Sequence, residues 1–282
     1  MDTIALVDNY PSEDERVLAE EIIRGGGGPA AVAAVALARL GISTAIVGTI
    51  GDDADGREIL DIFKREGVDS SGISIGVSPT AGSVIVASKR NSARAISTRQ
   101  PVVQAPINEA AKKSLSEAKW IHCDHVGINR LAELGISRGN GPKISFDAGY
   151  GVENFDVKLV DLFVPTDRQM ALRHPGHSLE DAMAKDAQSA SNTVVATRGS
   201  DGSAAYVDGF ISTPGFKVDV VSTLGAGDVF HGALVAQVVE GRPMPEALRR
   251  ANAVAALSCR SLDGQSAIPT LQELNNYLEA HS

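Results

Sequence analysis

A glycine-rich turn that opens an apolar helix is the segment best suited to chemistry. Residues 222–228 read Ser-Thr-Leu-Gly-Ala-Gly-Asp, and an apolar helix is predicted over residues 229–239. The first N–H groups of a helix lack intrahelical partners, and the helix dipole favours an anion beside them. Glycine lets the backbone approach a ligand closely. The segment therefore predicts an anion hole formed by Gly225, Ala226 and Gly227.

Asp228 follows this turn and has two interpretations. A carboxylate in the first turn of a helix commonly acts as a cap or as a partner of the helix dipole. Beside an anion hole, the same carboxylate can instead accept a proton from a substrate hydroxyl during phosphoryl transfer, while the N–H groups stabilise charge on the phosphate. The segment by itself is compatible with both roles.

The elements that must position this turn alternate between strands and helices, which indicates βαβ units and a mostly parallel sheet with helices on both faces. Helices are predicted over residues 29–40, 53–66, 129–137, 230–240, 245–260 and 270–280. Strands are predicted over residues 44–47, 120–123, 143–147, 162–165 and 193–197. The expected fold is one three-layer α/β/α domain over residues 1–282.

Two regions depart from this alternation and predict a small β lid. Residues 83–88 and 93–98 alternate apolar and polar side chains around the turn at residues 89–92, which is typical of a hairpin. Residues 3–23 also have an extended character without helical caps. A small sheet formed by both regions is predicted to cover the main domain.

Composition limits the partners and the compartment. The chain has 282 residues, of which 43% are hydrophobic, enough for a large core. Its formal net charge of −9 argues against a nucleic acid or an anionic membrane as the main partner. Cys123 and Cys259 form no spaced metal motif and are expected to be reduced thiols of a cytoplasmic protein.

Several ordered motifs resemble the ribokinase-like (pfkB) family of carbohydrate kinases. Residues 225–228 resemble the family's C-terminal signature, whose usual form is Asp-Thr-x-Gly-Ala-Gly-Asp with the last aspartate as base. Residues 27–28, 34–41 and 51–56 follow the order and spacing of its N-terminal signature. The resemblance spans nearly the whole chain. It implies a ribokinase-like fold, ATP and Mg²⁺ as cofactors, a small-molecule sugar substrate and Asp228 as the catalytic base.

The resemblance also implies binding residues. Gly27 and Gly28 would bring the backbone against the sugar, and Asp2 would hold sugar hydroxyls. The turn at residues 197–202 would bind the nucleotide, and the helix at residues 252–256 would border the adenine. Asp52 and Asp53 either cap a helix or line the site, with no catalytic role. The nucleotide-binding residues implied in this way are Thr197, Gly199, Gly202 and Asn252.

Three positions depart from the family pattern. Ser222 replaces an aspartate that helps many relatives to bind a monovalent cation, so weak activation by potassium is expected. Val32 replaces an asparagine that contacts the sugar. Residues 166–169, Thr-Asp-Arg-Gln, replace the Asn-x-x-Glu that is linked to magnesium through water. Mg²⁺ is therefore expected to be held by the nucleotide phosphates and water, with no protein metal ligand.

Within the family, residues 26–31 and 216–234 resemble sulfofructose kinases, and residues 120–122 resemble ketohexokinases. This predicts a ketose or an anionic ketose derivative as substrate. Arg16 falls at a basic position that meets the sulfonate, and Arg94 and Arg99 on the lid are either further anion ligands or a solvated strand edge. A nucleoside kinase and a non-catalytic sugar-binding regulator are the alternatives. Lid strands of this family often pair between subunits, so the resemblance implies a homodimer, by analogy alone.

Overall fold

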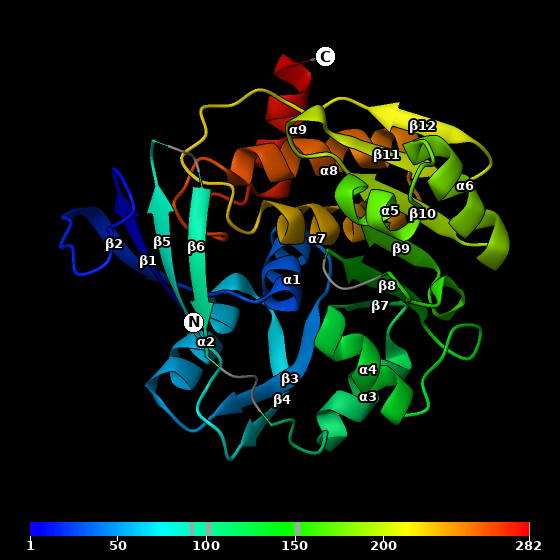
Figure 1. The fold of residues 1–282 in the computed structure, drawn as a ribbon. Helices are drawn as coiled ribbons and strands as arrows, with labels where there is room; N and C mark the ends of the chain where they lie inside the picture. The colour runs from blue at the N-terminus through cyan, green and yellow to red at the C-terminus, as the bar shows by residue number, and fades with distance from the viewer. Residues whose placement is uncertain (91–92, 100–102, 150–152, 282) are drawn as a thin grey trace.

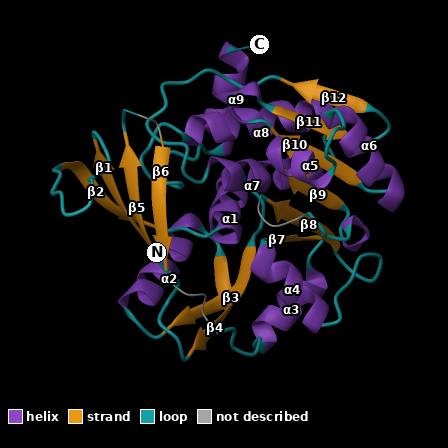
Figure 2. Ribbon diagram, in the orientation of Figure 1, coloured by secondary structure: helices purple, strands orange, loops and turns teal. Residues whose placement is uncertain are grey.

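A twisted, mostly parallel sheet forms the centre of the computed structural model, which describes residues 1–90, 93–99, 103–149 and 153–281 (Figures 1 and 2). Its strand order is β12-β11-β10-β9-β8-β7. The strands are β7 (Trp120–Cys123), β8 (Lys143–Ala148), β9 (Leu162–Pro165), β10 (Thr193–Thr197), β11 (Ser203–Tyr206) and β12 (Phe210–Thr213). β7 to β10 are parallel, whereas β11 and β12 are antiparallel additions at one edge.

Helices cover both faces of this sheet, as predicted. Along β9, Leu162 and Val164 belong to one hydrophobic core while Phe163 belongs to the other, because successive strand residues point to opposite faces. The first core includes residues of α1 (Pro29–Arg39), α7 (Ala226–Val239), α8 (Met244–Ser258) and α9 (Leu271–Ala280). The second core includes residues of α3 (Glu109–Glu117), α4 (His125–Glu133), α5 (Asp167–Arg173) and α6 (Leu179–Ala190).

The lid is a separate four-stranded sheet with the order β2-β1-β5-β6 (Figure 1). Its strands are β1 (Asp2–Val7), β2 (Ala19–Gly25), β5 (Ser83–Ser88) and β6 (Ala93–Thr98). The predicted hairpin strands are confirmed at both ends, although residues 91 and 92 of its turn lie outside the described residues. One face of the lid buries Ile4, Leu6 and Ile85 together with Leu262 of the main domain. This contact fixes the lid beside the amino-terminal end of α7.

Some predicted bounds were wrong. The helix predicted over residues 129–137 is α4, which begins at His125 because the Asp124 side chain accepts the Val126 and Gly127 N–H groups. α7 begins at Ala226 rather than at residue 230. The strand predicted over residues 44–47 extends to residue 51 as β3 (Ala45–Gly51). It forms a two-stranded sheet with β4 (Asp69–Gly76), and much of it is half-buried.

The glycine at the end of the second helix is confirmed as its stop. α2 (Ala54–Glu66) is capped by Asp53 and ends at Gly67, whose φ of 73° is left-handed. Asp53 accepts hydrogen bonds from the Gly56 N–H and from Thr80, and these bonds lower the pKa of Asp53 to about 2. This geometry supports the capping interpretation of Asp53. In the described parts of the chain, no helix has the length and apolarity needed to span a membrane.

Candidate active site

The amino-terminal end of α7 presents free backbone amides. Gly225 is the N-cap, and the first helical bond runs from the Val229 N–H to the Gly225 carbonyl at 2.9 Å. The N–H groups of Gly225, Gly227 and Asp228 have no hydrogen-bond partner among the described residues. The Ala226 N–H donates a long bond of 3.3 Å to the Thr223 carbonyl. Three amides are thus free for an anion, as predicted in number, but the Asp228 amide takes the place of the predicted Ala226 amide.

The two glycines of this turn serve different purposes. A Cβ on Gly225 would lie 2.8 Å from the Gly264 Cα, and the φ of Gly225 is 73°, so packing and backbone conformation both require glycine there. A Cβ on Gly227 would meet no atom within 4 Å. Protein packing therefore gives no reason for glycine at position 227, whereas the open space beside it leaves room for a ligand.

Asp228 lies at this open end and is half-buried. Burial raises the pKa of Asp228 to about 8, and the Asp147 carboxylate adds to the increase, as do Asp124 and Asp2. The Arg94 guanidinium acts in the opposite direction and lowers the pKa. The N-cap of α7 is Gly225, and the Asp228 carboxylate accepts no hydrogen bond from the described residues, so Asp228 is not a hydrogen-bonding cap. A base whose pKa lies near the working pH is efficient in proton transfer.

The structure brings Asp2 and the double glycine together. A side chain on Gly27 would overlap the Asp2 carboxylate, so the backbone of the glycine segment lies directly against that residue. Gly28 follows as the N-cap of α1 with a φ of 93°. Burial raises the pKa of Asp2, and the charge of Asp2 in turn acts on Asp228. The predicted sugar-binding residues and the predicted base thus face one region.

The three candidate arginines occupy different places. Arg94, on β6, donates from Nη1 to the Thr223 Oγ1 at 3.0 Å, so the lid reaches the turn that precedes the anion hole. Arg99 donates to the Thr80 carbonyl at 2.7 Å and supports the lid. Arg16 is exposed on the segment between β1 and β2. Of the three, Arg94 is the one whose charge acts on Asp228.

The predicted nucleotide-binding residues form one wall. Thr197 ends β10, and the following turn is closed by a 2.8 Å bond from the Arg198 N–H to the Gly202 carbonyl. A side chain on Gly202 would overlap the backbone at residues 213–215. Asn252 is 5% exposed, and its side-chain amide donates hydrogen bonds to the carbonyls of residues 213 and 214, at 3.2 and 3.1 Å. The Asn252 amide therefore fixes the backbone of residues 213 and 214, against which Gly202 packs.

Gly199 completes this turn with a φ of 54° and open space where a Cβ would be.

The residues present fit Mg²⁺ that arrives with the nucleotide. Within the described residues, no group of three or more His, Cys, Asp or Glu side chains is arranged to hold a metal. Gln169 occupies the position of the family's glutamate, and its buried Oε1 has no hydrogen-bond partner among the described residues. A neutral amide oxygen can accept a hydrogen bond from a metal-bound water, although it adds no charge.

Ser222 offers only a neutral oxygen, and its Oγ already accepts the Leu224 N–H at 3.1 Å. We therefore expect activity to depend weakly on potassium. The measurement exchanges potassium for a bulky organic cation at constant ionic strength and compares kcat. A loss of about tenfold or more, equivalent to about 1.4 kcal/mol in the barrier, would contradict this expectation.

Sequence analysis missed Asp124, Asp147 and His231. Asp124 and Asp147 lie at the carboxyl ends of β7 and β8, the edge at which open α/β sheets bind ligands. Asp147 already ended a predicted strand, so its place at this edge was available from the sequence. His231 follows Asp228 by three residues and therefore lies on the same face of α7.

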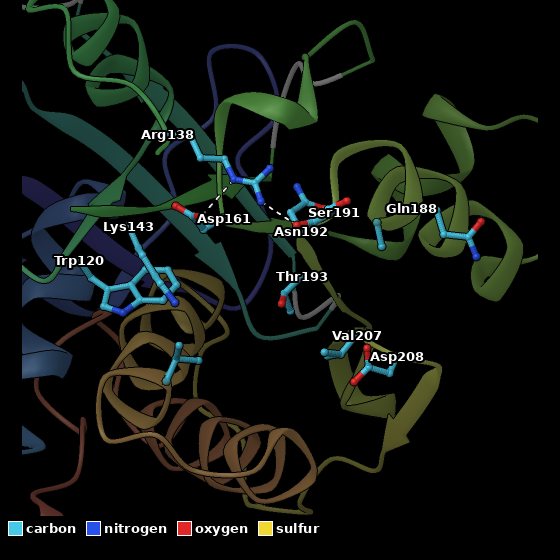
Figure 3. Close-up of a pocket in the computed structure, with 12 residues that line it drawn as sticks. Trp120, Arg138, Lys143, Asp161, Gln188, Ser191, Asn192, Thr193, Val207 and Asp208 are labelled. Atoms are coloured by element: carbon cyan, nitrogen blue, oxygen red, sulfur yellow. Dashed lines mark hydrogen bonds and ion pairs between the residues drawn. The ribbon is translucent and has the colours of Figure 1, made fainter. Parts of the chain in front are cut away.

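A cavity lies at a different place in the molecule. It has a volume of about 630 Å³ and is lined by residues near the amino-terminal ends of the central strands, among them Trp120, Lys143 and Thr193 (Figure 3). Arg138 there is held by Asp161 and by the carbonyls of residues 190 and 191. None of the predicted site residues lines this cavity. The chemistry described above is located at the opposite edge of the sheet.

Comparisons with known proteins identify the family of this chain. The pattern described as pfkB family carbohydrate kinase matches residues 1–132 and 156–271. A ribokinase of Haemophilus influenzae is 28% identical, over 90% of this chain and 87% of the relative. An ATP-dependent ribose-1-phosphate kinase of Halopiger xanaduensis is 27% identical, over 98% of this chain and 94% of the relative. The crystal structure of a putative ribokinase from Agrobacterium tumefaciens superposes with a TM-score of 0.88 at 23% identity, over 99% and 94% of the two chains.

Proposed function

Because this chain belongs to the pfkB family of carbohydrate kinases, we propose that it transfers the γ-phosphoryl group of ATP to a primary alcohol of a ketose or of an anionic ketose derivative. That it is an ATP-dependent sugar kinase follows from the family. The observation that carries the proposed mechanism is Asp228 beside three free amides at the end of α7.

In this mechanism, Asp228 accepts the proton of the sugar alcohol as the alcohol oxygen forms a bond to the γ-phosphorus. The bond from that phosphorus to the β–γ bridging oxygen breaks, and ADP leaves with the electron pair. The free amides of Gly225, Gly227 and Asp228 stabilise negative charge on the transferring group. Mg²⁺ bound to the nucleotide supplies positive charge that neutralises the phosphates.

Asp2 and the segment at Gly27 and Gly28 support a sugar site beside the base. The carboxylate of Asp2 can accept hydrogen bonds from sugar hydroxyls, and the glycines expose their backbone on the same side. The wall formed by Thr197, Gly199, Gly202 and the segment that Asn252 holds supports the nucleotide site. In this proposal Asn252 is a positioning residue rather than a direct contact.

The position of Arg94 supports the proposal that the sugar carries an anionic substituent. Its guanidinium reaches the Thr223 hydroxyl from the lid, and it is suited to a planar, bidentate contact with a phosphate or sulfonate. Arg16 remains a second candidate ligand from the exposed segment of the lid. The resemblance of residues 26–31 to sulfofructose kinases supports a ketose. The ribose-1-phosphate kinase relative favours an anionic aldopentose as the second candidate.

A substrate panel tests the proposal. We expect kcat/KM to be higher for fructose, sulfofructose or fructose 6-phosphate than for ribose, ribose 1-phosphate or adenosine. ATP consumption measured at saturating ATP gives the ranking, and a reaction without sugar is the control. Highest activity with adenosine would establish the nucleoside kinase alternative, and highest activity with a ribose compound would replace the ketose by an aldopentose. No turnover with any of these sugars would favour the non-catalytic regulator.

The outer face of the lid supports the proposed homodimer. Ile22 and Val84 are 66% and 58% exposed, and both lie on the face opposite the buried Ile4 and Ile85. Apolar side chains gathered on an exposed sheet are typical of an association surface.

Cys123 and Cys259 are buried and form no disulfide. Buried thiols without a disulfide are consistent with a reducing compartment, and the proposed location is therefore the cytoplasm.

A further inference from the structure

Beneath Asp228, a buried carboxylate and a buried histidine lie outside the mechanism derived above. His231 is 4% exposed, and its Nε2 lies 3.3 Å from the Asp147 Oδ1. The same oxygen accepts the Gly149 N–H at 3.0 Å. One carboxylate oxygen therefore accepts a hydrogen bond from the segment after β8 and lies in contact with a side chain of α7. The Asp147 side chain is only 10% exposed, so its orientation is fixed by these contacts.

The histidine is uncharged in this arrangement. Burial lowers the pKa of His231, although Asp147 opposes the change. The buried Nδ1 of His231 has no hydrogen-bond partner among the described residues. The ring of His122 lies 5.7 Å from the ring of His231, and burial lowers its pKa to about 4. Neither imidazole therefore supplies a cation to neutralise Asp147.

We propose that Asp147 is a positioning residue for the base: held by the Gly149 amide against His231, one turn along α7 from Asp228, its carboxylate sets the pH at which Asp228 becomes able to accept a proton. The inference rests on the proposed role of Asp228. Two carboxylates that share a site cannot both ionise easily, so a fixed Asp147 anion keeps Asp228 protonated to a higher pH. Asp228 then becomes a stronger base, because the strength of a general base increases with its pKa.

Other charges face Asp228 from the neighbouring elements. Asp124 after β7 and Asp2 on β1 act in the same direction as Asp147, while Arg94 on β6 acts against it. Asp147 is distinguished from the other two carboxylates by its contact with His231, a residue of α7 itself. Its effect on Asp228 is also larger than theirs, second only to that of burial.

The test measures the pKa of Asp228 in Asp147→Asn, which keeps the size of the side chain and removes its charge. We expect the acidic limb of kcat/KM against pH to move to lower pH by about one unit. His231→Leu removes the polar side chain that contacts Asp147 and should move the limb in the same direction by less, whereas His231→Gln keeps a polar side chain there and should leave the profile close to that of the wild type. Asp124→Asn, whose asparagine still caps α4, is the matched control and should produce a smaller shift than Asp147→Asn.

A second readout does not depend on catalysis. NMR titration of protein labelled with ¹³C at the aspartate carboxyl carbons follows Asp228 directly, and the resonance that disappears in Asp228→Asn identifies it. An unchanged Asp228 titration in Asp147→Asn would overturn the inference, even in an active kinase. A shifted titration in a protein that phosphorylates no sugar would uphold the coupling and refute the proposed function instead. If Asp147→Asn does not fold, the two His231 variants carry the same test.

Discussion

Asp228→Asn is expected to abolish most turnover while the protein stays folded and continues to bind ATP. Asparagine has the same size as aspartate, but it cannot accept the proton of the sugar alcohol. General-base catalysis contributes about 10²–10⁴-fold, so kcat should fall by roughly that factor. ATP affinity should stay similar or improve, because the variant lacks a negative charge near the γ-phosphate. Steady-state kcat, nucleotide titration and Tm on one preparation test all three expectations.

The capping interpretation of Asp228 predicts a different pattern. Under that interpretation asparagine would still cap the helix and only the charge beside the helix dipole would be lost, so stability would fall by about 0.3–1 kcal/mol and kcat would stay nearly intact. Asp156→Asn provides a matched control, since Asp156 is an exposed carboxylate whose side chain accepts the Lys158 N–H and lies outside the site. An Asp228→Asn enzyme that keeps more than about a third of wild-type kcat falls outside the range of general-base catalysis and would refute the mechanism.

The elements with strong local signals were predictable. The two hairpin strands alternate apolar and polar residues on both sides of a polar turn, and their bounds agree with β5 and β6. α1 has proline in its first turn and a left-handed Gly41 after its end. α6 was not predicted, because its buried residues are mainly alanines, which give a weak periodic signal. β11 and β12 were also missed, because β11 consists mainly of small residues and neither strand alternates apolar and polar side chains.

The site was predictable only where residues are neighbours in sequence. The anion hole and Asp228 share one turn, so sequence sufficed to place them together. Which amides of the turn are free was not predictable, because the hydrogen bond from the Ala226 N–H to the Thr223 carbonyl depends on the local fold of the turn. The approach of Asp147 to α7 depends on how β8 packs beneath that helix. Such a tertiary distance has no signature in a single sequence.

Arg94 likewise shows what the tertiary structure adds. As part of a sequence, it is compatible with a solvated strand edge, and every described residue of β6 is exposed. The fold nevertheless places its guanidinium 3.0 Å from the Thr223 hydroxyl, where its charge acts on the base. Arg16 is also exposed, but it lies on the segment between β1 and β2 and has no resolved effect on Asp228. Exposure alone therefore does not separate a functional arginine from a solvated one.

Arg94→Ala is expected to raise KM for an anionic sugar far more than for its neutral counterpart. A hydrogen bond to a charged group contributes about 1.5–3 kcal/mol, which corresponds to a change in affinity of roughly 10- to 100-fold. Fructose 6-phosphate and fructose form a suitable pair of substrates, and the ratio of their kcat/KM values is the measurement. Removal of the cation should also raise the pKa of Asp228, so the acidic limb of the pH profile should move to higher pH.

Arg90→Ala is the matched control for this change. Arg90 lies just beyond β5 in the same hairpin and is exposed, but it pairs with Asp8 at 3.2 Å rather than with the active-site turn. It should leave the ratio for the two sugars unchanged, and Arg16→Ala tests the other candidate ligand in the same assay. Arg94→Lys keeps the charge but loses the bidentate geometry, so it should lie between alanine and wild type. An equal loss with fructose and fructose 6-phosphate would show that Arg94 serves the γ-phosphate or lid closure, because only recognition of the sugar's own anion makes the two substrates respond differently.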